Sequence, residues 1–358
     1  MADFLTGLWT VTTIELRQRV RGVAWYVLLG VFVFLLLVVT GIMTFALSFA
    51  GGEDTGGVVY SVVIYFVLLL STLVTPALSG NMINGDRDAG TLATTQVTLV
   101  TTPQLVLGKF VAAWISALAF LVAAIPFLLW SFALGGTNPA TVVVSILVLA
   151  FELGIVAAAG VGLSGLMRRP LFSVAVTYLL VAMLSVGTLI GFSLGGLALQ
   201  TKVTVQNSYV DYSDPDQQYD DNGNPIDPVC ITQPPMETTF PRFDLVWWML
   251  AANPYVVLAD AEPSHFESDG TITYDLFAGI KLGVRSAQVP IELTGYDECA
   301  EINEPGYQQT NKELIESTTP SWLVGMLIHL GLAVAALWGA IALTHAPSRR
   351  LAAGSRVA

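Results

Sequence analysis

Three charged residues, Asp86, Arg87 and Asp88, follow one another directly after a long stretch that has no charged side chain. That stretch runs from Thr55 to Gly85. Carboxylates beside a guanidinium at an exposed position can form charge-assisted hydrogen bonds with a partner protein. They can also cap a helix and keep the apolar segment before them from sliding into lipid. Both roles place the cluster at a membrane surface, and the two roles are compatible.

Two further ionisable side chains, Glu152 and His329, lie within apolar runs. An ionised carboxylate near the middle of a bilayer costs about 3 kcal/mol or more, so Glu152 should face protein, water or a partner charge, or be neutral. Both residues are therefore candidates for the lining of a translocation path. The alternatives are a glutamate that is hydrogen-bonded inside a helix bundle and a histidine that is satisfied without Glu152.

The composition places the chain among membrane proteins. Of its 358 residues, 54% are hydrophobic and 12% are charged, whereas soluble domains carry roughly 25% charged residues. The net charge is −12, but residues 201–318 hold 20 of the 27 acidic and only 5 of the 15 basic residues, a balance of −15. The acidity thus belongs to one polar segment on a mildly basic membrane body, and we expect no nucleic-acid partner.

Six apolar runs are long enough to cross a bilayer, which takes about 20 helical residues. A seventh apolar stretch, Phe243–Ala261, is interrupted at Asn253-Pro254, and we expect two short helices at the outer membrane surface there. The predicted fold is therefore an all-α polytopic membrane protein with six transmembrane helices. The predicted spans are Val23–Ala50, Val58–Ile83, Phe110–Leu134, Ala140–Met167, Leu171–Leu199 and Trp322–Leu343.

The basic residues predict which way the chain crosses the membrane. Six spans put both termini on one side, and cytoplasmic flanks of spans carry an excess of Lys and Arg. We therefore expect a multi-pass protein of the plasma (inner, cytoplasmic) membrane with both termini in the cytoplasm and residues 201–318 outside. The basic residues on the side of the termini are Arg17, Arg19, Arg21, Arg87, Lys109, Arg168, Arg169, Arg349, Arg350 and Arg356.

The predicted organisation has five parts. The first is an amphipathic interfacial helix, because apolar residues recur there at helical spacing, although a solvated leader is the alternative. Within the second part, the segment 89–108 holds many threonines and Pro103, and we expect a short interfacial helix with a turn. The parts are residues 1–22 (interfacial helix), 23–200 (spans one to five, with a cytoplasmic loop at 84–108), 201–318 (extracytoplasmic domain), 319–346 (span six) and 347–358 (cytoplasmic tail).

Two other features concern how the chain is held together. Both cysteines, Cys230 and Cys299, lie in the polar segment, which predicts a disulfide in an oxidising compartment; two unpaired thiols are the alternative. Such a bridge would stabilise the segment by about 4 kcal/mol in the chain-entropy description. The run Gly154–Gly165 is rich in small residues and suits close helix packing, either within the chain or against a second copy.

The cytoplasmic loop resembles that of a known family. The sequence NGDRDAGTLATTQVTLVTTPQLVLGKF (84–110) is similar to the loop between spans two and three of ABC-2 type permeases, the membrane subunits of ABC exporters. That loop has an acidic–basic–acidic cluster, Gly-Thr-Leu, Thr-Pro and Leu-Gly-Lys. The cluster more often contains Glu, where this chain has Asp. The matching residues are Asp86-Arg87-Asp88, Gly90-Thr91-Leu92, Thr102-Pro103 and Leu107-Gly108-Lys109.

The resemblance extends to the N-terminal helix, the six spans and Asn253-Pro254-Tyr255 before span six. It covers roughly residues 1–200 and 320–350. It leaves out most of residues 201–318, where typical members have a much shorter loop.

The resemblance implies a permease subunit that forms the translocation path of an ATP-driven exporter. A separate ATPase would dock at Asp86, Arg87, Asp88, Gly90 and Thr91. The chain has no Gly-rich phosphate-binding loop, so ATP and Mg²⁺ are expected on the partner ATPase, and no cofactor, metal or catalytic residue is expected in this chain.

Two permeases, of the same or homologous chains, and two ATPases would form the working unit. An apolar bundle with one carboxylate favours an amphipathic or cationic substrate. The alternative is a non-transporting polytopic membrane protein that senses or assembles partners through its extracytoplasmic domain. A membrane-embedded enzyme is disfavoured because the spans have so few ionisable side chains.

Overall fold

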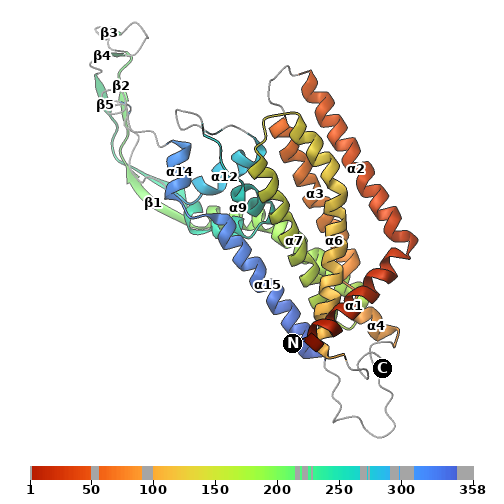
Figure 1. The fold of residues 1–358 in the computed structure, drawn as a ribbon. Helices are drawn as coiled ribbons and strands as arrows, with labels where there is room; N and C mark the ends of the chain where they lie inside the picture. Colours follow the sequence, from red (N-terminus) through yellow and green to blue (C-terminus); the bar gives the residue numbers. More distant parts are fainter. Residues whose placement is uncertain are drawn as a thin grey trace.

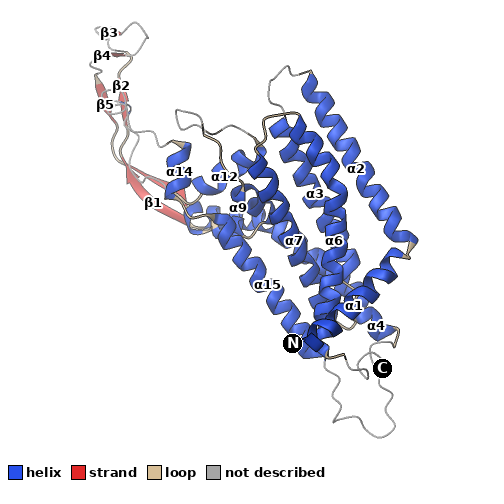
Figure 2. Ribbon diagram, in the orientation of Figure 1, coloured by secondary structure: helices blue, strands red, loops and turns tan. Residues whose placement is uncertain are grey.

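A computed structural model describes residues 2–49, 56–90, 100–213, 218–219, 225–226, 229–266, 272, 275–290, 298 and 310–344. Long helices form the body, and an arm of short strands projects from one end (Figures 1 and 2). Helices α1 and α4 and the last turn of α15 lie at the opposite end from that arm (Figure 1). Of the sequence predictions, those on Thr91, Cys299 and the tail at 347–358 concern residues outside the described ranges.

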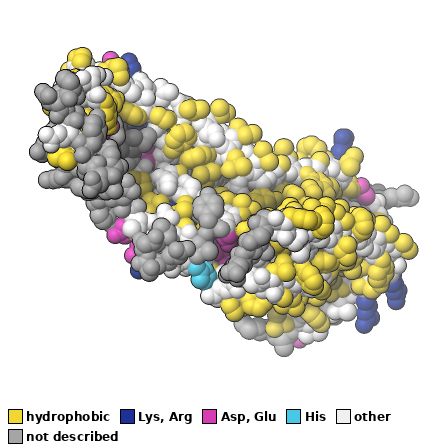
Figure 3. All heavy atoms as spheres, turned by 90° about the horizontal axis from the view of Figure 1, so that it is seen from above, with side chains coloured by type: hydrophobic (Ala, Val, Ile, Leu, Met, Phe, Trp, Pro, Cys, Tyr) yellow, Lys and Arg dark blue, Asp and Glu magenta, His cyan; other side chains and the backbone are white. Residues whose placement is uncertain are grey.

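Six helical segments among the described residues are long and apolar enough to span a membrane, as the sequence predicts. The chain is therefore a mostly helical, multi-pass membrane protein. Hydrophobic side chains spread over the helical body, while acidic and basic side chains gather toward its ends (Figure 3). The segments are α2 (Val23–Ser48), α3 with α4 (Gly56–Ser79 and Asn84–Asp88), α6 (Thr102–Ala133), α7 (Pro139–Leu166), α8 with η1 and α9 (Pro170–Ala182, Met183–Gly187 and Thr188–Ala198) and α15 (Ser321–Thr344).

The third span begins earlier than predicted. Helix α6 starts at Thr102 rather than at Phe110, so its first turns replace the end of the expected interfacial helix and turn. The Thr101 side chain and Gln104 form a capping box, and the backbone N–H of Thr101 donates to Gln104 Oε1 at 2.7 Å. Such caps satisfy the free N–H groups of a first turn. The predicted span three began just after Lys109, whereas in the structure Lys109 lies within α6. The helix can include this charge because carboxylates pair with it.

The N-terminal segment forms the predicted helix, α1 (Ala2–Val20). It lies against the first turns of α6, where Thr12 Oγ1 donates to the backbone oxygen of Gly108 at 3.0 Å. A Cβ at Gly108 would come within 2.8 Å of Val11 Cβ, so the absence of a side chain permits this close crossing. Apolar side chains of Leu5 and Trp9 remain exposed, as a helix at a membrane surface requires.

The apolar stretch before span six forms short helices rather than a seventh span: η2 (Phe243–Leu245), α10 (Trp248–Ala251) and α11 (Pro254–Ala261). Asn253 begins α11 by accepting a hydrogen bond from the N–H of Tyr255 at 2.9 Å. Its amide nitrogen donates to the backbone oxygen of Ser185 at 2.6 Å and to Thr188 Oγ1 at 2.9 Å. Ser185 lies in the π-helical turn η1 (Met183–Gly187). Such a turn changes the hydrogen-bond pattern of the helix backbone, and the carbonyl of Ser185 is then within reach of Asn253.

The segment after α9 contains strands, which the all-α prediction did not include. All three pairs are antiparallel and nested, so they form one two-stranded arm. Helices α12 (Leu276–Ser286) and α14 (Asn311–Ser317) follow the arm and the short helices in the described part of residues 201–318. The strand pairs are β1 (Gln200–Val205) with β6 (Met236–Pro241), β2 (Ser208–Val210) with β5 (Cys230–Thr232) and β3 (Gln218–Tyr219) with β4 (Pro225–Ile226).

The small-residue run Gly154–Gly165 packs within the chain, which resolves the choice left open by the sequence. A Cβ at Gly162 would lie 2.5 Å from the Cβ of Ala336, and one at Gly165 would lie 2.5 Å from the Cβ of Ala340. Helix α7 is therefore in backbone contact with α15 along this face. Close approach through small residues is a common way for helices to associate in membranes.

Gly162→Ala should destabilise the protein even though alanine favours helix formation. The added methyl group collides with Ala336, and overpacking of this kind typically costs about 1–3 kcal/mol. Gly331→Ala on α15 is the matched control, because nothing lies within 4 Å of its built Cβ. Thermal unfolding in detergent micelles measures both variants, and equal stabilities would show that the α7–α15 contact is looser than described.

Candidate functional site

The charged cluster found in the sequence lies on α4, a five-residue helix set off from α3 by a turn. The turn follows Gly80, where a Cβ would lie 3.0 Å from the Cα of Val174. Ser164 on α7 holds the start of α4: its Oγ accepts from the N–H of Ile83 at 2.9 Å and of Asn84 at 3.1 Å. The same hydroxyl donates to Asn84 Oδ1 at 2.9 Å. Helix α4 is thereby fixed to α7.

A buried ammonium group connects α4 to two other helices. Lys109 Nζ on α6 lies 2.6 Å from Asp86 Oδ2 and also contacts Glu15 Oε1 on α1. The Lys109 side chain is 2% exposed, against 36% for Asp86. A lysine has three N–H donors and no acceptor, so two carboxylates suit it well. The ion pairs tie α1, α4 and α6 together at this end of the bundle.

The remaining residues of the cluster divide into inward and outward positions. Arg87 donates to the backbone oxygen of Met167 at 3.1 Å, a carbonyl just past the end of α7 that has no helical partner. Asp88 is exposed and makes no hydrogen bond or ion pair with the described part of the chain. Gly90 is also exposed and has a φ of 70°, a conformation that favours glycine. Among the described residues, Asp88 and Gly90 therefore form the exposed side of this cluster.

A second contact from α1 reaches the turn between α3 and α4. Arg19 Nη2 donates to the backbone oxygen of Leu78 at 2.7 Å and approaches Met82 Sδ at 2.9 Å. The N–H of Met82 bonds to Ser79 instead of Leu78, so the break in the helix makes this carbonyl available. Burial lowers the pKa of Arg19, while the charge of Glu15 acts in the opposite direction.

The structure brings Glu152 and His329 together, although they lie on α7 and α15. His329 Nδ1 is 2.9 Å from Glu152 Oε1, and its Nε2 is 2.8 Å from the backbone oxygen of Ala252. The Glu152 and His329 side chains are 3% and 1% exposed. A carbonyl only accepts, so Nε2 carries a proton, and the contact with Glu152 shares one more. The pair is then neutral overall, which removes most of the cost of a lone charge in the membrane.

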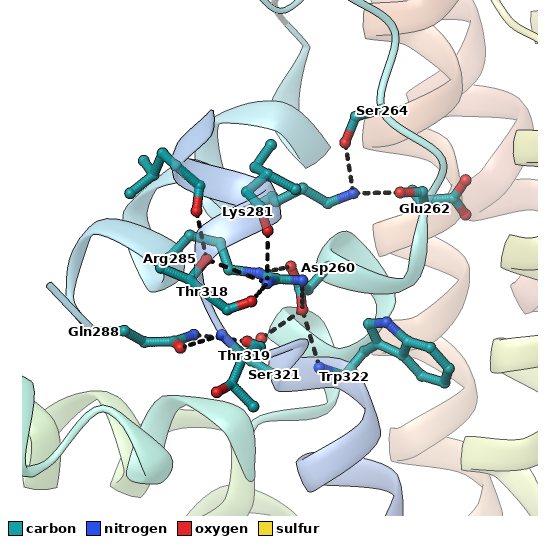
Figure 4. A network of polar contacts seen from close by, with 12 residues as sticks. Asp260, Glu262, Ser264, Lys281, Arg285, Gln288, Thr318, Thr319, Ser321 and Trp322 are labelled. Carbon is teal, nitrogen blue, oxygen red and sulfur yellow. Dashed lines mark hydrogen bonds and ion pairs between the residues drawn. The ribbon is translucent and has the colours of Figure 1, made fainter. Parts of the chain in front are cut away.

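The sequence did not reveal a third network, at the N-terminal end of α15 (Figure 4). Arg285 forms a two-point pair with Asp260, with Nε to Oδ1 at 2.7 Å and Nη2 to Oδ2 at 3.1 Å. Asp260 Oδ2 also accepts from Ser321 Oγ at 2.7 Å and from the N–H of Trp322 at 3.0 Å. The carboxylate therefore caps α15 and fixes it to α11 and α12.

The predicted disulfide stays a prediction, because Cys299 lies outside the described residues. Cys230 is on β5, in register with Val210 on β2. Glu298, the residue before Cys299, accepts from the N–H of Val210 at 3.1 Å and from the hydroxyl of Tyr212 at 2.9 Å.

A comparison with protein-family models finds no match for this chain, and neither does a comparison with curated proteins. The function must therefore be argued from the residues and their geometry.

Lys109→Met should strongly destabilise the protein. It leaves two carboxylates side by side without their cation, and breaking a buried pair costs about 3–5 kcal/mol. Asp88→Asn is the control, because Asp88 is exposed and a change there should cost less than about 0.5 kcal/mol. Thermal unfolding of the purified protein compares the two, and similar stabilities would contradict a structural role for Lys109.

Glu152→Gln should be nearly neutral for stability, whereas Glu152→Leu should lower it by about 1–3 kcal/mol. The glutamine amide can donate to Nδ1 while Nε2 still donates to Ala252, but leucine leaves Nδ1 without a partner. Unfolding midpoints in detergent distinguish the two variants. A glutamine variant as unstable as the leucine variant would mean that the pair needs its carboxylate.

Proposed function

We propose that the chain is the permease subunit of an ATP-driven exporter of the ABC-2 type. It would form the translocation path and dock a separate ATPase through residues 84–108. The observation that carries the proposal is how the residues of the charged cluster are arranged. Asp86 and Arg87 contact neighbouring helices, while Asp88 and Gly90 are exposed. A short helix with a free charged end, fastened to several spans, suits an element that passes a partner's movement into the bundle.

The contacts define how such a movement would spread. A displacement of α4 pulls on Lys109 through Asp86, and so on α6, and through Glu15 on α1. Ser164 and Arg87 extend the coupling to α7. Lys109 is buried, so a separation would leave its charge unpaired inside the protein, and the three charged groups should therefore move together. Nucleotide binding and hydrolysis would take place on the ATPase, and this chain would supply the response.

The same proposal assigns orientation and partners. It puts this end in the cytoplasm of a plasma membrane protein and the β arm outside, and the basic residues near α1, α4 and α6 support that orientation. A second permease, of the same or a homologous chain, would complete the path. The exposed apolar faces of α2, α8 and α9 offer surface to lipid and to that partner.

Glu152 and His329 fit this proposal as groups that become accessible when the path opens. Their contact joins α7 to α15, and the bond to Ala252 joins both to α10. An outward path between these helices would expose a carboxylate and an imidazole to the transported compound. In this state the pair closes the bundle.

The competing function is sensing or assembly without transport, through the outer domain. The projecting β arm supports it, because apolar side chains are exposed along both strands of the arm and could meet a partner. They include Tyr209, Tyr212, Ile231 and Met236.

Asp88→Arg should reduce recovery of an ABC ATPase by about fivefold or more, because a reversed interface charge costs at least about 1 kcal/mol. The ATPase is recovered with the tagged chain from solubilised native membranes and identified by mass spectrometry from its phosphate-binding loop. Asp88 is a cleaner probe than Asp86 or Arg87, whose loss disturbs contacts within the chain.

Glu237→Arg is the matched control, since Glu237 is an exposed acidic residue of the β arm. Equal ATPase recovery with wild type and Asp88→Arg would remove α4 as the docking element. Recovery of no ATPase from any variant would favour the sensing function.

A further inference from the structure

The outer end of the bundle contains a cavity of about 400 Å³. It lies between the start of α3, the turn from α6 to α7, and the residues that join α11 to α12. Its lining is partly polar and partly apolar, and the residues that matter below are Tyr60, Thr137, Glu262, Asp275, Phe277 and Lys281. None of the clusters described above uses this cavity.

Glu262 is 4% exposed, and neither oxygen of its carboxyl group makes a hydrogen bond of ordinary geometry with a described residue. The hydroxyl of Thr141, which also lines the cavity, is close enough to oppose the effect of burial on the pKa of Glu262. The hydroxyl of Thr137, on another wall of the same cavity, is also buried without a partner. Buried polar side chains almost always have partners, so two such groups at one cavity call for an explanation. Both can accept a hydrogen bond from a molecule in the cavity.

The nearest cation does not neutralise Glu262. Lys281 Nζ donates to the backbone oxygen of Glu262 and to Ser264 Oγ, the latter at 2.9 Å. Figure 4 shows the carboxyl group of Glu262 on the far side from this amine, with no contact drawn to it. Asp275 is engaged elsewhere, because it caps α12 by accepting from the N–H of Ala278 at 2.8 Å. The cavity thus holds two carboxyl groups and one ammonium.

We propose that this cavity binds a small organic cation, whose ammonium group pairs with Glu262 and donates a hydrogen bond to Thr137. Small-molecule sites measure about 300–1,000 Å³, and one water needs only about 30 Å³, so the space exceeds that of a bare ion. Tyr60 and Phe277 supply aromatic surface, which attracts cations. No group of three or more metal-ligating side chains is found in the described part of the chain.

The site should bind more tightly as the pH rises. Burial raises the pKa of Glu262 to about 8, with the charge of Lys281 and the hydroxyl of Thr141 acting in the opposite direction. Without a bound cation, the carboxyl group of Glu262 is therefore mostly protonated at neutral pH. It must lose this proton to pair with a cation. Burial also raises the pKa of Asp275 and lowers that of Lys281.

As the pH rises, the other titratable groups that face Glu262 either strengthen the binding of a cation or leave it unchanged. Loss of a proton from Asp275, Lys281 or the exposed rim residue His265 makes the cavity more negative. The hydroxyl of Tyr60 is held by Ser145 Oγ at 2.5 Å. An alkylammonium ion stays charged up to about pH 10, as a lysine side chain does. Affinity for it should therefore increase from about pH 6 to about pH 9.

The test uses the purified full-length chain in nanodiscs, with cyclohexylammonium as the probe and cyclohexanol as its neutral counterpart. Calorimetry and thermal shift should show saturable binding of the ammonium ion alone. Glu262→Gln should weaken it by about tenfold or more, because a charge-assisted hydrogen bond is lost. Glu237→Gln, on the β arm outside the cavity, should bind as wild type does.

Thr137→Val keeps the shape of its side chain and should weaken binding a few-fold, so it serves if Glu262→Gln does not fold. Equal binding of cyclohexanol, or unchanged affinity in both cavity variants, would overturn the proposal. So would an affinity that does not rise with pH. Stabilisation by Ca²⁺ or Mg²⁺ that depends on Glu262, without binding of the ammonium ion, would replace the organic cation by a metal. Each outcome is independent of whether an ATPase docks at α4.

Discussion

The end of the bundle that holds α1 and α4 depends on one constraint: an ammonium group that is shut away from water must keep its counter-charges. Lys109 has almost no solvent contact, so Asp86 and Glu15 have to lie beside it. That requirement sets the place of α4, brings α1 across the first turns of α6, and permits the helix to continue through a charged residue. Arg19, Thr12 and Ser164 then fix details of an arrangement whose geometry the lysine already determines.

Polar contacts recur at three levels of an otherwise apolar bundle, and each joins different helices. Lys109 acts at the end that holds α1 and α4, Glu152 with His329 inside, and Asp260 with Arg285 at the opposite end. Between these levels, α7 and α15 meet through glycine and alanine, which offer contact but little preference for one register. The polar pairs supply that preference, since a shift by one residue would leave buried charges without partners.

The sequence predicted the helices whose length follows from the thickness of the bilayer. It did not predict which faces of two helices meet, which charges pair, or which strands pair. Apolar runs near 20 residues predicted six spans, and Asn253-Pro254 correctly argued against a seventh. A charge normally ends a span, so the sequence predicts that span three begins after Lys109; the two carboxylates that pair with it lie on other elements and cannot be assigned from the sequence. The sequence gives the approximate depth of Glu152 and His329 in the membrane. It does not give the helix face on which each side chain lies, so it cannot predict their contact. The strands of the arm left only weak alternation of Val and Thr at 201–205 and Thr at 238–239.

The β arm begins two residues after α9 ends, and its base is bound to that helix. The N–H of Arg242 donates to the backbone oxygens of Gly196 and Leu199 at 3.2 and 2.7 Å, and the ring of Phe243 fills the space beside Gly196. The base of the arm is thus fastened to the C-terminal end of α9, from which the strands project (Figure 1). A tilt of α9 would therefore carry the base of the arm with it, so that a change inside the bundle would alter the direction in which the strands point.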